Sequence, residues 1–153
     1  MVVCAIERAF CRAMRNTDWQ TKSIESTAKT QDVLRKNILI VDDEENLLLL
    51  LERILGKQGY QVVTAKNSYD ALALLETRVF QLAILDIKMF PIDGVVLLGE
   101  IKSRRPAIEV IMITAYPTID TRNKCMQKGA STYLTKPVDI QELKATVDGL
   151  LSY

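Results

Sequence analysis

The sequence predicts an α/β fold in which helices cover both faces of a five-stranded parallel sheet. Five short apolar runs bounded by turn residues indicate strands: residues 38–41, 60–65, 81–86, 108–113 and 132–134. Five segments with helical character follow them in alternation: residues 46–55, 68–79, 94–102, 118–128 and 140–150. Regular alternation of this kind requires parallel pairing through right-handed crossovers, and continuously apolar strands are buried on both faces. The expected architecture is therefore a doubly wound α/β sandwich.

The first strand stops at an acidic run, DDEE, at residues 42–45. The leucine-rich helix that follows is expected to end at Gly56, because glycine is favoured just past a helix. Five consecutive leucines, Leu47 to Leu51, exceed what one buried face can use. Either this is an ordinary core helix with one or two exposed leucines, or the N-terminal segment or a partner covers Leu48 or Leu49.

The second helix is expected to be capped by Ser68, with Leu72, Leu75 and Val79 facing the core. The third strand then runs into Asp86. The fourth helix is polar and is expected to end at a glycine, Gly129. The third and fifth helices are expected to pack on the sheet through apolar residues: Leu97, Leu98, Ile101, Ile140, Leu143, Val147 and Leu150.

Residues 1–36 differ in character from the rest of the chain and are predicted to be an N-terminal extension and linker. Residues 1–15 place apolar side chains at helical spacing, which indicates either a short amphipathic helix or a disordered segment. Residues 16–36 are rich in Thr, Ser, Gln, Asp and Lys, as linkers are. The domain itself is expected to occupy residues 37–153.

Composition limits the possible functions. Twenty basic and nineteen acidic residues give a net charge of +1, so there is no general electrostatic reason to expect binding to nucleic acid or to an anionic membrane. The chain contains no histidine, which excludes histidine-based acid/base or metal chemistry, and any phosphohistidine must belong to another protein. Three widely spaced cysteines, Cys4, Cys11 and Cys125, fit free thiols in a reducing compartment. With no leader or membrane-spanning stretch expected, the predicted location is the cytoplasm.

Polar residues fall at or just beyond the carboxyl ends of four predicted strands: Asp42, Asp43, Asp86, Thr114 and Lys136. Because these strand ends share one edge of a parallel sheet, the five side chains are expected to lie close together. Three neighbouring carboxylates repel one another unless a cation is present, and hard oxygen ligands suit Mg²⁺. The same set supplies what phosphoryl transfer to a carboxylate needs, namely a nucleophile, a divalent ion, a lysine charge and a hydroxyl donor.

The motifs DD, DxxM…DG, T-A and KP, in this order and spacing, resemble the receiver domain of bacterial two-component response regulators over residues 37–152. The resemblance implies a flavodoxin-like sheet of order 2-1-3-4-5. It implies that Asp86 is the phosphoacceptor and that the backbone carbonyl of Lys88 joins the acidic pair in binding Mg²⁺. It also implies a switch pair, Thr114 and Tyr133, although Tyr133 is equally compatible with plain half-buried packing.

The resemblance further implies partners and modulating residues. A sensor histidine kinase or phosphotransfer protein would phosphorylate the domain, which would then bind an effector or a second copy through the face of the fourth helix, fifth strand and fifth helix. Lys88 and Tyr116 are expected to influence dephosphorylation, and the bulky ring of Tyr116 predicts slow loss of phosphate. Phe90-Pro91 after Met89 departs from the Met-Pro-Gly common in the family, which leaves the path of this loop open.

Two other functions compete with a phosphorylation switch. One is a receiver-like interaction or dimerisation module that acts without phosphorylation. The other is an aspartyl-phosphate hydrolase, which would need a second acid two residues after the nucleophile, where Lys88 stands. We therefore expect a phosphoacceptor signalling domain rather than a metabolic enzyme, without direct nucleic acid or membrane binding, either as a single-domain regulator or as part of a longer one.

Overall fold

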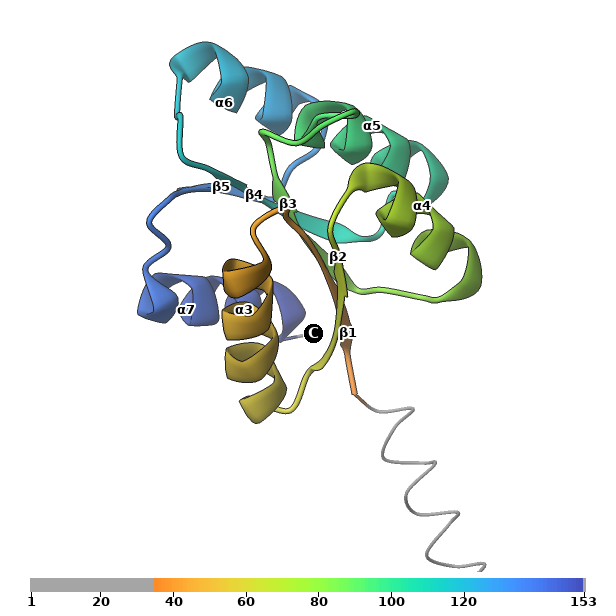
Figure 1. The fold of residues 1–153 in the computed structure, drawn as a ribbon, viewed down its shortest axis with the longest axis vertical. Helices are drawn as coiled ribbons and strands as arrows, with labels where there is room; N and C mark the ends of the chain where they lie inside the picture. The colour runs from red at the N-terminus through yellow and green to blue at the C-terminus, as the bar shows by residue number, and fades with distance from the viewer. Residues whose placement is uncertain (1–34, 153) are drawn as a thin grey trace, which may run out of the picture. The chain divides into compact units, whose positions relative to one another are not determined.

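The computed structural model describes residues 35–152, which form ten alternating strands and helices (Figure 1). The strands are β1 (Asn37–Val41), β2 (Gln61–Ala65), β3 (Leu82–Asp86), β4 (Glu109–Thr114) and β5 (Thr132–Thr135). The helices are α3 (Glu45–Lys57), α4 (Ser68–Thr77), α5 (Gly94–Arg104), α6 (Ile119–Gln127) and α7 (Ile140–Leu151). All five predicted strands and all five predicted helices are present. The N-terminal helix or linker predicted before residue 35 lies outside the described residues.

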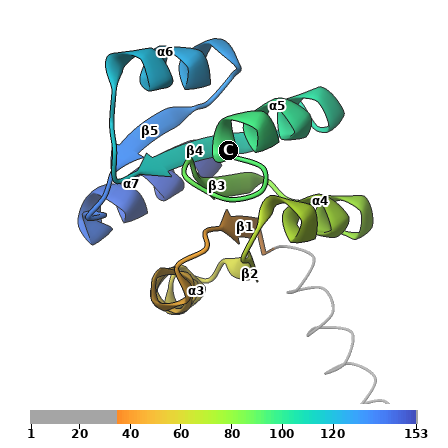
Figure 2. The same ribbon diagram turned by 45° about the horizontal axis from the view of Figure 1, so that its top comes forward.

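The strands form one parallel sheet in the order β2-β1-β3-β4-β5, as expected. Helices α4, α5 and α6 cover one face, and α3 and α7 cover the other (Figures 1 and 2). Alternate residues of each strand therefore enter different layers of the core: in β1, Leu39 and Val41 join the first layer, while Ile38 and Ile40 join the second. The doubly wound sandwich is confirmed.

The central strand β3 explains why the core is stable and where the site lies. All five of its residues are buried, because a strand in the middle of a two-sided sheet meets side chains on both faces. Complete burial of a leucine or isoleucine side chain contributes about 1.5–3 kcal/mol. The four apolar residues of β3 therefore hold the strand in the core, and its last residue, Asp86, is its one charged residue.

Helix α4 differs from the prediction at both ends. Its N-cap is Asn67, whose side chain accepts a hydrogen bond from the Asp70 amide, so Ser68 is the first helical residue and not the cap. The helix ends at Thr77, and Val79 is 67% exposed instead of facing the core. The reason is that the backbone becomes extended at Arg78, and the Val79 carbonyl accepts a hydrogen bond of 2.8 Å from the side-chain amide of Asn37 at the start of β1.

Helix α3 ends later than predicted. Gly56 lies within the helix, and the backbone takes a positive φ of 95° at Gly59, which is the conformation that glycine supplies past a helix end. Gly129 plays the predicted role after α6, with φ of 98°.

The five leucines of α3 divide between core and surface. Leu48 and Leu51 are buried, whereas Leu49 and Leu50 are 59% and 46% exposed. The prediction that one or two leucines are exposed is confirmed, but Leu48 is a core residue and needs no covering partner. Among residues 35–152, no helix is long and apolar enough to cross a membrane.

Candidate functional site

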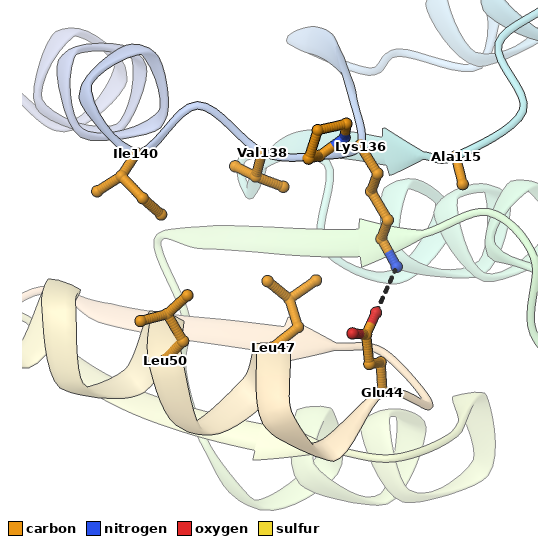
Figure 3. A pocket seen from close by; sticks show the side chains of 8 residues that line it. Glu44, Leu47, Leu50, Ala115, Lys136, Val138 and Ile140 are labelled. Carbon is orange, nitrogen blue, oxygen red and sulfur yellow. Dashed lines mark ion pairs between the residues drawn. The ribbon is translucent and has the colours of Figure 1, made fainter.

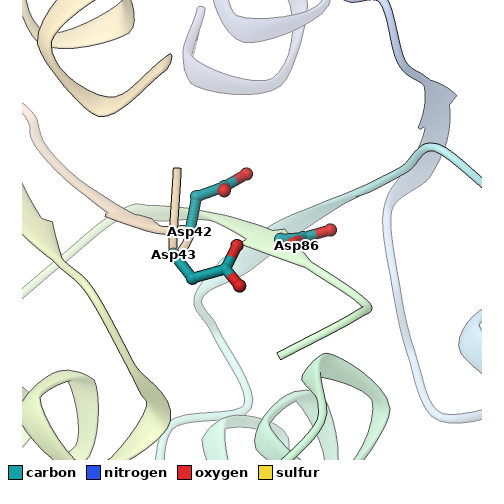
Figure 4. A group of neighbouring side chains, drawn as sticks. All are labelled: Asp42, Asp43 and Asp86. Atoms are coloured by element: carbon teal, nitrogen blue, oxygen red, sulfur yellow. The ribbon is translucent and has the colours of Figure 1, made fainter. Parts of the chain in front are cut away.

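Three carboxylates meet at the carboxyl edge of the sheet. Asp42 and Asp43 follow β1, and Asp86 is the last residue of β3, the neighbouring strand. One oxygen from each lies within 4.8 Å of the others (Figure 4). Asp42 and Asp86 are 3% and 5% exposed, while Asp43 is exposed to solvent. The site is therefore acidic, half-enclosed and open on the side of Asp43.

Lys136, just beyond β5, reaches into this acidic group. Its Nζ lies 2.8 Å from Asp42 Oδ2 and 3.7 Å from Asp86 Oδ2. The backbone holds it there, because the Lys136 amide donates to the carbonyl of Thr114 at 2.8 Å. Burial lowers the pKa of Lys136, but the hydrogen bond and charge of Asp42 and the charges of Asp86 and Glu44 outweigh that effect and raise it. Lys136 is therefore a permanent cation in the site.

Asp86 has an altered affinity for protons. Its pKa is raised from 3.8 to about 6, first by burial and then by the charge of Asp42. Lys136 and a hydrogen bond from the backbone amide of Lys88 act in the opposite direction. The ionised form, which is the nucleophilic one, is thus the major form at neutral pH, and a further cation would stabilise it.

Thr114 ends β4 beside Asp86 and is completely buried. Its Oγ1 accepts a hydrogen bond of 3.1 Å from the backbone amide of Tyr116. The Tyr116 side chain is 69% exposed, so in this structure its ring lies on the surface.

Tyr133 in β5 is half-buried and packs against the core layer beneath α4, α5 and α6. Burial raises the pKa of its hydroxyl. Together with Ile119 and Arg122 of α6, it lines a small surface hollow. Both the packing and the switch interpretations remain compatible with this position.

The loop after Asp86 is held close to the site. The Lys88 amide donates to the Asp86 carboxylate, while the Lys88 side chain points to solvent. At the end of the loop, a Cβ added to Gly94 would lie 2.0 Å from the carbonyl oxygen of Asp86, so only glycine fits there. The Phe90–Pro91 peptide bond is cis, and Phe90 is 89% exposed. The loop after Met89, whose path the sequence left open, therefore carries Phe90 on its surface.

Three residues near the site were not predicted from the sequence. Glu44 approaches Lys136 to 3.8 Å, and its amide donates to Asp42 Oδ1 at 2.8 Å, which orients that carboxylate. The acidic run itself could have indicated this role. Ser68 bonds the loop after Asp86, and Gly94 approaches the backbone of Asp86. Gly94 is the glycine of the DG motif, but the sequence alone does not show this close approach, and the bond of Ser68 has no local sequence signal.

The donor set fits a hard divalent cation. Three carboxylates face one nearby ammonium, that of Lys136, so the group carries excess negative charge. Burial is the largest cause of the raised pKa of Asp86, and the negative charges of Asp42 and Asp43 add to it. Oxygen ligands in a half-open site suit Mg²⁺, which retains several of its own waters.

An apolar groove of about 530 Å³ adjoins the site between α3 and the loop from β5 to α7 (Figure 3). Glu44 and Lys136 lie at its polar end. Its walls are apolar: Leu47, Leu50, Ala115, Pro137, Val138 and Ile140.

Comparison with known proteins agrees with this geometry. Residues 38–148 match the response regulator receiver domain family. The transcriptional regulatory protein ZraR of Salmonella typhimurium is 36% identical over 117 residues, which cover 76% of this chain and 26% of that protein. The chain thus spans about a quarter of the length of the curated relatives it matches.

Solved structures show the same fold. A CheY-like receiver domain protein from Methanospirillum hungatei superposes with a TM-score of 0.75 and 34% identity, covering 77% of this chain and 94% of that one. A response regulator from Burkholderia pseudomallei, solved with a phosphorylated aspartic acid, calcium ion and citrate, gives a TM-score of 0.68 and 30% identity. The matched region covers 72% of this chain and 65% of that one.

Proposed function

The chain belongs to the response regulator receiver domain family, and on this premise we propose that it accepts a phosphoryl group on Asp86 and thereby switches a partner-binding surface. Receiver domains of response regulators interact with histidine kinases and effector domains. The single observation that carries the proposal is the convergence of Asp42, Asp43 and Asp86 with Lys136 at one sheet edge.

The proposed reaction is a phosphoryl transfer between proteins. An oxygen of the Asp86 carboxylate attacks the phosphorus of a phosphohistidine, the P–N bond breaks as a P–O bond forms, and the histidine nitrogen keeps the bonding electrons and takes up a proton. The donor histidine must come from a partner kinase or phosphotransfer protein, because this chain contains no histidine. Asp86 has the required nucleophilic form, since its pKa of about 6 leaves it mainly ionised above that pH.

The neighbouring residues would stabilise the transferred group. The Lys136 ammonium, now 2.8 Å from Asp42 Oδ2 and 3.7 Å from Asp86 Oδ2, would also pair with the oxygens of a phosphoryl group on Asp86. Thr114 would donate its hydroxyl hydrogen, which is free to do so because the hydroxyl oxygen acts as acceptor for Tyr116. The Lys88 amide keeps the Asp86 carboxylate oriented.

Asp42, Asp43, Asp86 and the backbone carbonyl of Lys88 would hold Mg²⁺. When bound, the ion would neutralise the negative charge of the phosphoryl oxygens. The phosphorylated aspartic acid and calcium ion in the Burkholderia pseudomallei regulator support this assignment by similarity.

We propose that the output surface is the face of α6, β5 and α7. Thr114 and Tyr133 lie on adjacent strands, so a movement of Thr114 toward the phosphoryl group can be passed to Tyr133 and the hollow beside it. Ile119 on this face is 83% exposed, which suits binding to an effector or a second copy.

Tyr116 and Lys88 would influence how a hydrolytic water reaches the phosphorylated Asp86. A cytoplasmic location is proposed because Cys125 is a free thiol.

The test is phosphorylation of the purified chain by acetyl phosphate with Mg²⁺, followed by intact-mass measurement and compared with Asp86→Asn. The wild type should gain one phosphoryl group and the variant none. Beryllofluoride with Mg²⁺ should change the amide NMR signals of residues 114–135 in the wild type alone. Equal modification of both proteins, or none of either, would refute the proposal and favour a module that binds without phosphorylation.

A further inference from the structure

Within residues 35–152, the buried polar and charged residues are Asp42, Ser68, Asp86 and Thr114. Three of them belong to the site described above, and their proposed chemistry explains why a polar group is buried there. Ser68 belongs to α4, which carries none of the five predicted strand-end residues. A buried hydroxyl costs free energy unless it is hydrogen-bonded, so its presence requires a separate explanation.

Helix α4 does not need a serine at its first position, Ser68. Asn67 caps α4 by accepting the Asp70 amide, so the serine hydroxyl is not needed at the helix end. Alanine would be the better residue in both respects, because it has the higher helix propensity and no polar group to desolvate. The hydroxyl instead donates a hydrogen bond of 2.9 Å to the backbone carbonyl of Ile92.

Ile92 belongs to the loop of residues 87–93, which joins Asp86 to α5. The first part of this loop is fixed by the backbone: the Ile87 amide donates to Ile113 at 3.0 Å, and the Ile87 carbonyl accepts from Met89 and Gly94. Phe90 and Pro91 are exposed and contribute little packing. Ser68 supplies a bond to the second part, on the far side of this exposed tip.

We propose that Ser68 is a positioning residue for the phosphoacceptor site. By holding the Ile92 carbonyl, it restricts the loop from the end opposite to Asp86. The Lys88 amide then stays directed at the Asp86 carboxylate, and the Lys88 carbonyl stays available to the cation. The inference rests on the proposed function of Asp86. It adds to the site a residue of α4, whereas the five residues predicted from the sequence all lie at the ends of strands.

The experiment compares the wild-type chain of 153 residues with Ser68→Thr, Ser68→Cys and Ser68→Ala, which form a series from full donor to weak donor to none. Ser131→Ala is the matched control, because the Ser131 hydroxyl also bonds the backbone, accepting from the Val110 amide at 3.0 Å, but at the opposite edge of the sheet. Urea unfolding of each protein separates a general loss of stability from a local one.

The first measurement is amide hydrogen exchange in metal-free protein. Loss of one hydrogen bond corresponds to about a three- to tenfold change in an opening equilibrium. Exchange at Met89 and Gly94 should accelerate by that factor in Ser68→Ala, less in Ser68→Cys and little in Ser68→Thr. Ser131→Ala should leave both amides unchanged.

The second measurement is the dissociation constant for Mg²⁺ alone and the rate of phosphorylation by acetyl phosphate. Both should worsen by a similar factor along the same series, with Ser131→Ala at the wild-type values. If exchange, Mg²⁺ affinity and phosphorylation in Ser68→Cys and Ser68→Ala all match the wild type, Ser68 has no positioning role, even if these variants are less stable. A wild type that neither binds Mg²⁺ nor accepts phosphate would instead overturn the proposed function, and the positioning role with it.

Discussion

The ammonium of Lys136 lies 2.8 Å from Asp42 and 3.7 Å from Asp86, so one cation is shared by two buried carboxylates from neighbouring strands. This sharing sets the charge state of the phosphoacceptor, because Lys136 is the main group that lowers the pKa of Asp86.

Replacing Lys136 by alanine should therefore raise the pKa of Asp86 above its value of about 6 and slow phosphorylation near neutral pH. Part of the loss should be recovered at higher pH, where Asp86 ionises again. Carbon NMR titration of the Asp86 carboxyl group measures the first effect, and the rate with acetyl phosphate measures the second. Lys136→Arg retains the charge and should keep the pKa near that of the wild type. An unchanged pKa in Lys136→Ala would contradict the assigned electrostatics.

The raised pKa of Asp86 also predicts that stability depends on pH. The folded-state pKa of about 6 lies above the ordinary value of 3.8, so the carboxyl group favours folding only while it is protonated. Its contribution is complete below about pH 4 and is lost as the pH rises through 6. In metal-free protein above pH 7, Asp86→Asn should be more stable than the wild type by about 2–3 kcal/mol, and the difference should vanish near pH 4.

Urea unfolding at several pH values checks this prediction. Adding Mg²⁺ should stabilise the wild type in proportion to ligand binding and should stabilise Asp86→Asn much less. Asp120→Asn is a suitable control, because Asp120 is exposed and should show a difference of only a few tenths of a kcal/mol. Equal stability of wild type and Asp86→Asn across the whole pH range would show that folding does not raise the pKa of Asp86.

Gly94 permits the start of α5 to approach the backbone of Asp86. A methyl group there would lie 2.0 Å from the Asp86 carbonyl oxygen, so Gly94→Ala requires the backbone to move. We expect a loss of about 1–3 kcal/mol or more, together with weaker Mg²⁺ binding. Gly149→Ala is the matched control, since it lies in α7 with nothing within 4 Å of the added atom, and should gain about 0.5–1 kcal/mol. Urea unfolding compares the two, and similar effects for both would contradict the predicted clash.

The strand-end residues could be predicted because each one lies at or just beyond the end of a predicted strand, and parallel strands bring their ends to one edge. This local signal placed Asp42, Asp86, Thr114 and Lys136 correctly relative to the sheet. The roles of Ser68 and Gly94 could not be predicted in this way. Ser68 bonds a carbonyl 24 residues further along the chain, and such a contact depends on how two helices and a loop pack.

The errors at helix ends have a similar origin. Val79 continues the apolar spacing of α4. Its carbonyl is hydrogen-bonded by the side chain of Asn37 in β1, so this tertiary contact ends the helix before the apolar pattern ends. The prediction that α3 ends at Gly56 was wrong, because the helix continues to Lys57 and the glycine with a positive φ is Gly59.

A last prediction concerns a contact far from the site, between the loop before β2 and helix α7. The Tyr60 hydroxyl donates to Asp148 Oδ1 at 2.7 Å. Burial, this hydrogen bond and the negative charge of Asp148 raise the pKa of Tyr60 to about 12, above its ordinary value of 10. Because the folded-state pKa is raised, the stabilisation is complete below pH 10 and is lost as the pH rises from 10 to 12.

Tyr60→Phe should therefore be less stable than the wild type at pH 8 by about 1 kcal/mol, which is the usual contribution of one partly exposed hydrogen bond. The two proteins should converge in stability as the pH approaches 12. Ultraviolet absorbance titration measures the tyrosinate directly, and Asp148→Asn should bring the Tyr60 pKa back toward 10 because it removes the charge that opposes ionisation. If Tyr60 ionises near pH 10 in the wild type, the contact with Asp148 does not persist in solution, and the attachment of α7 to the sheet does not depend on it, since Leu143, Val147 and Leu151 are buried there.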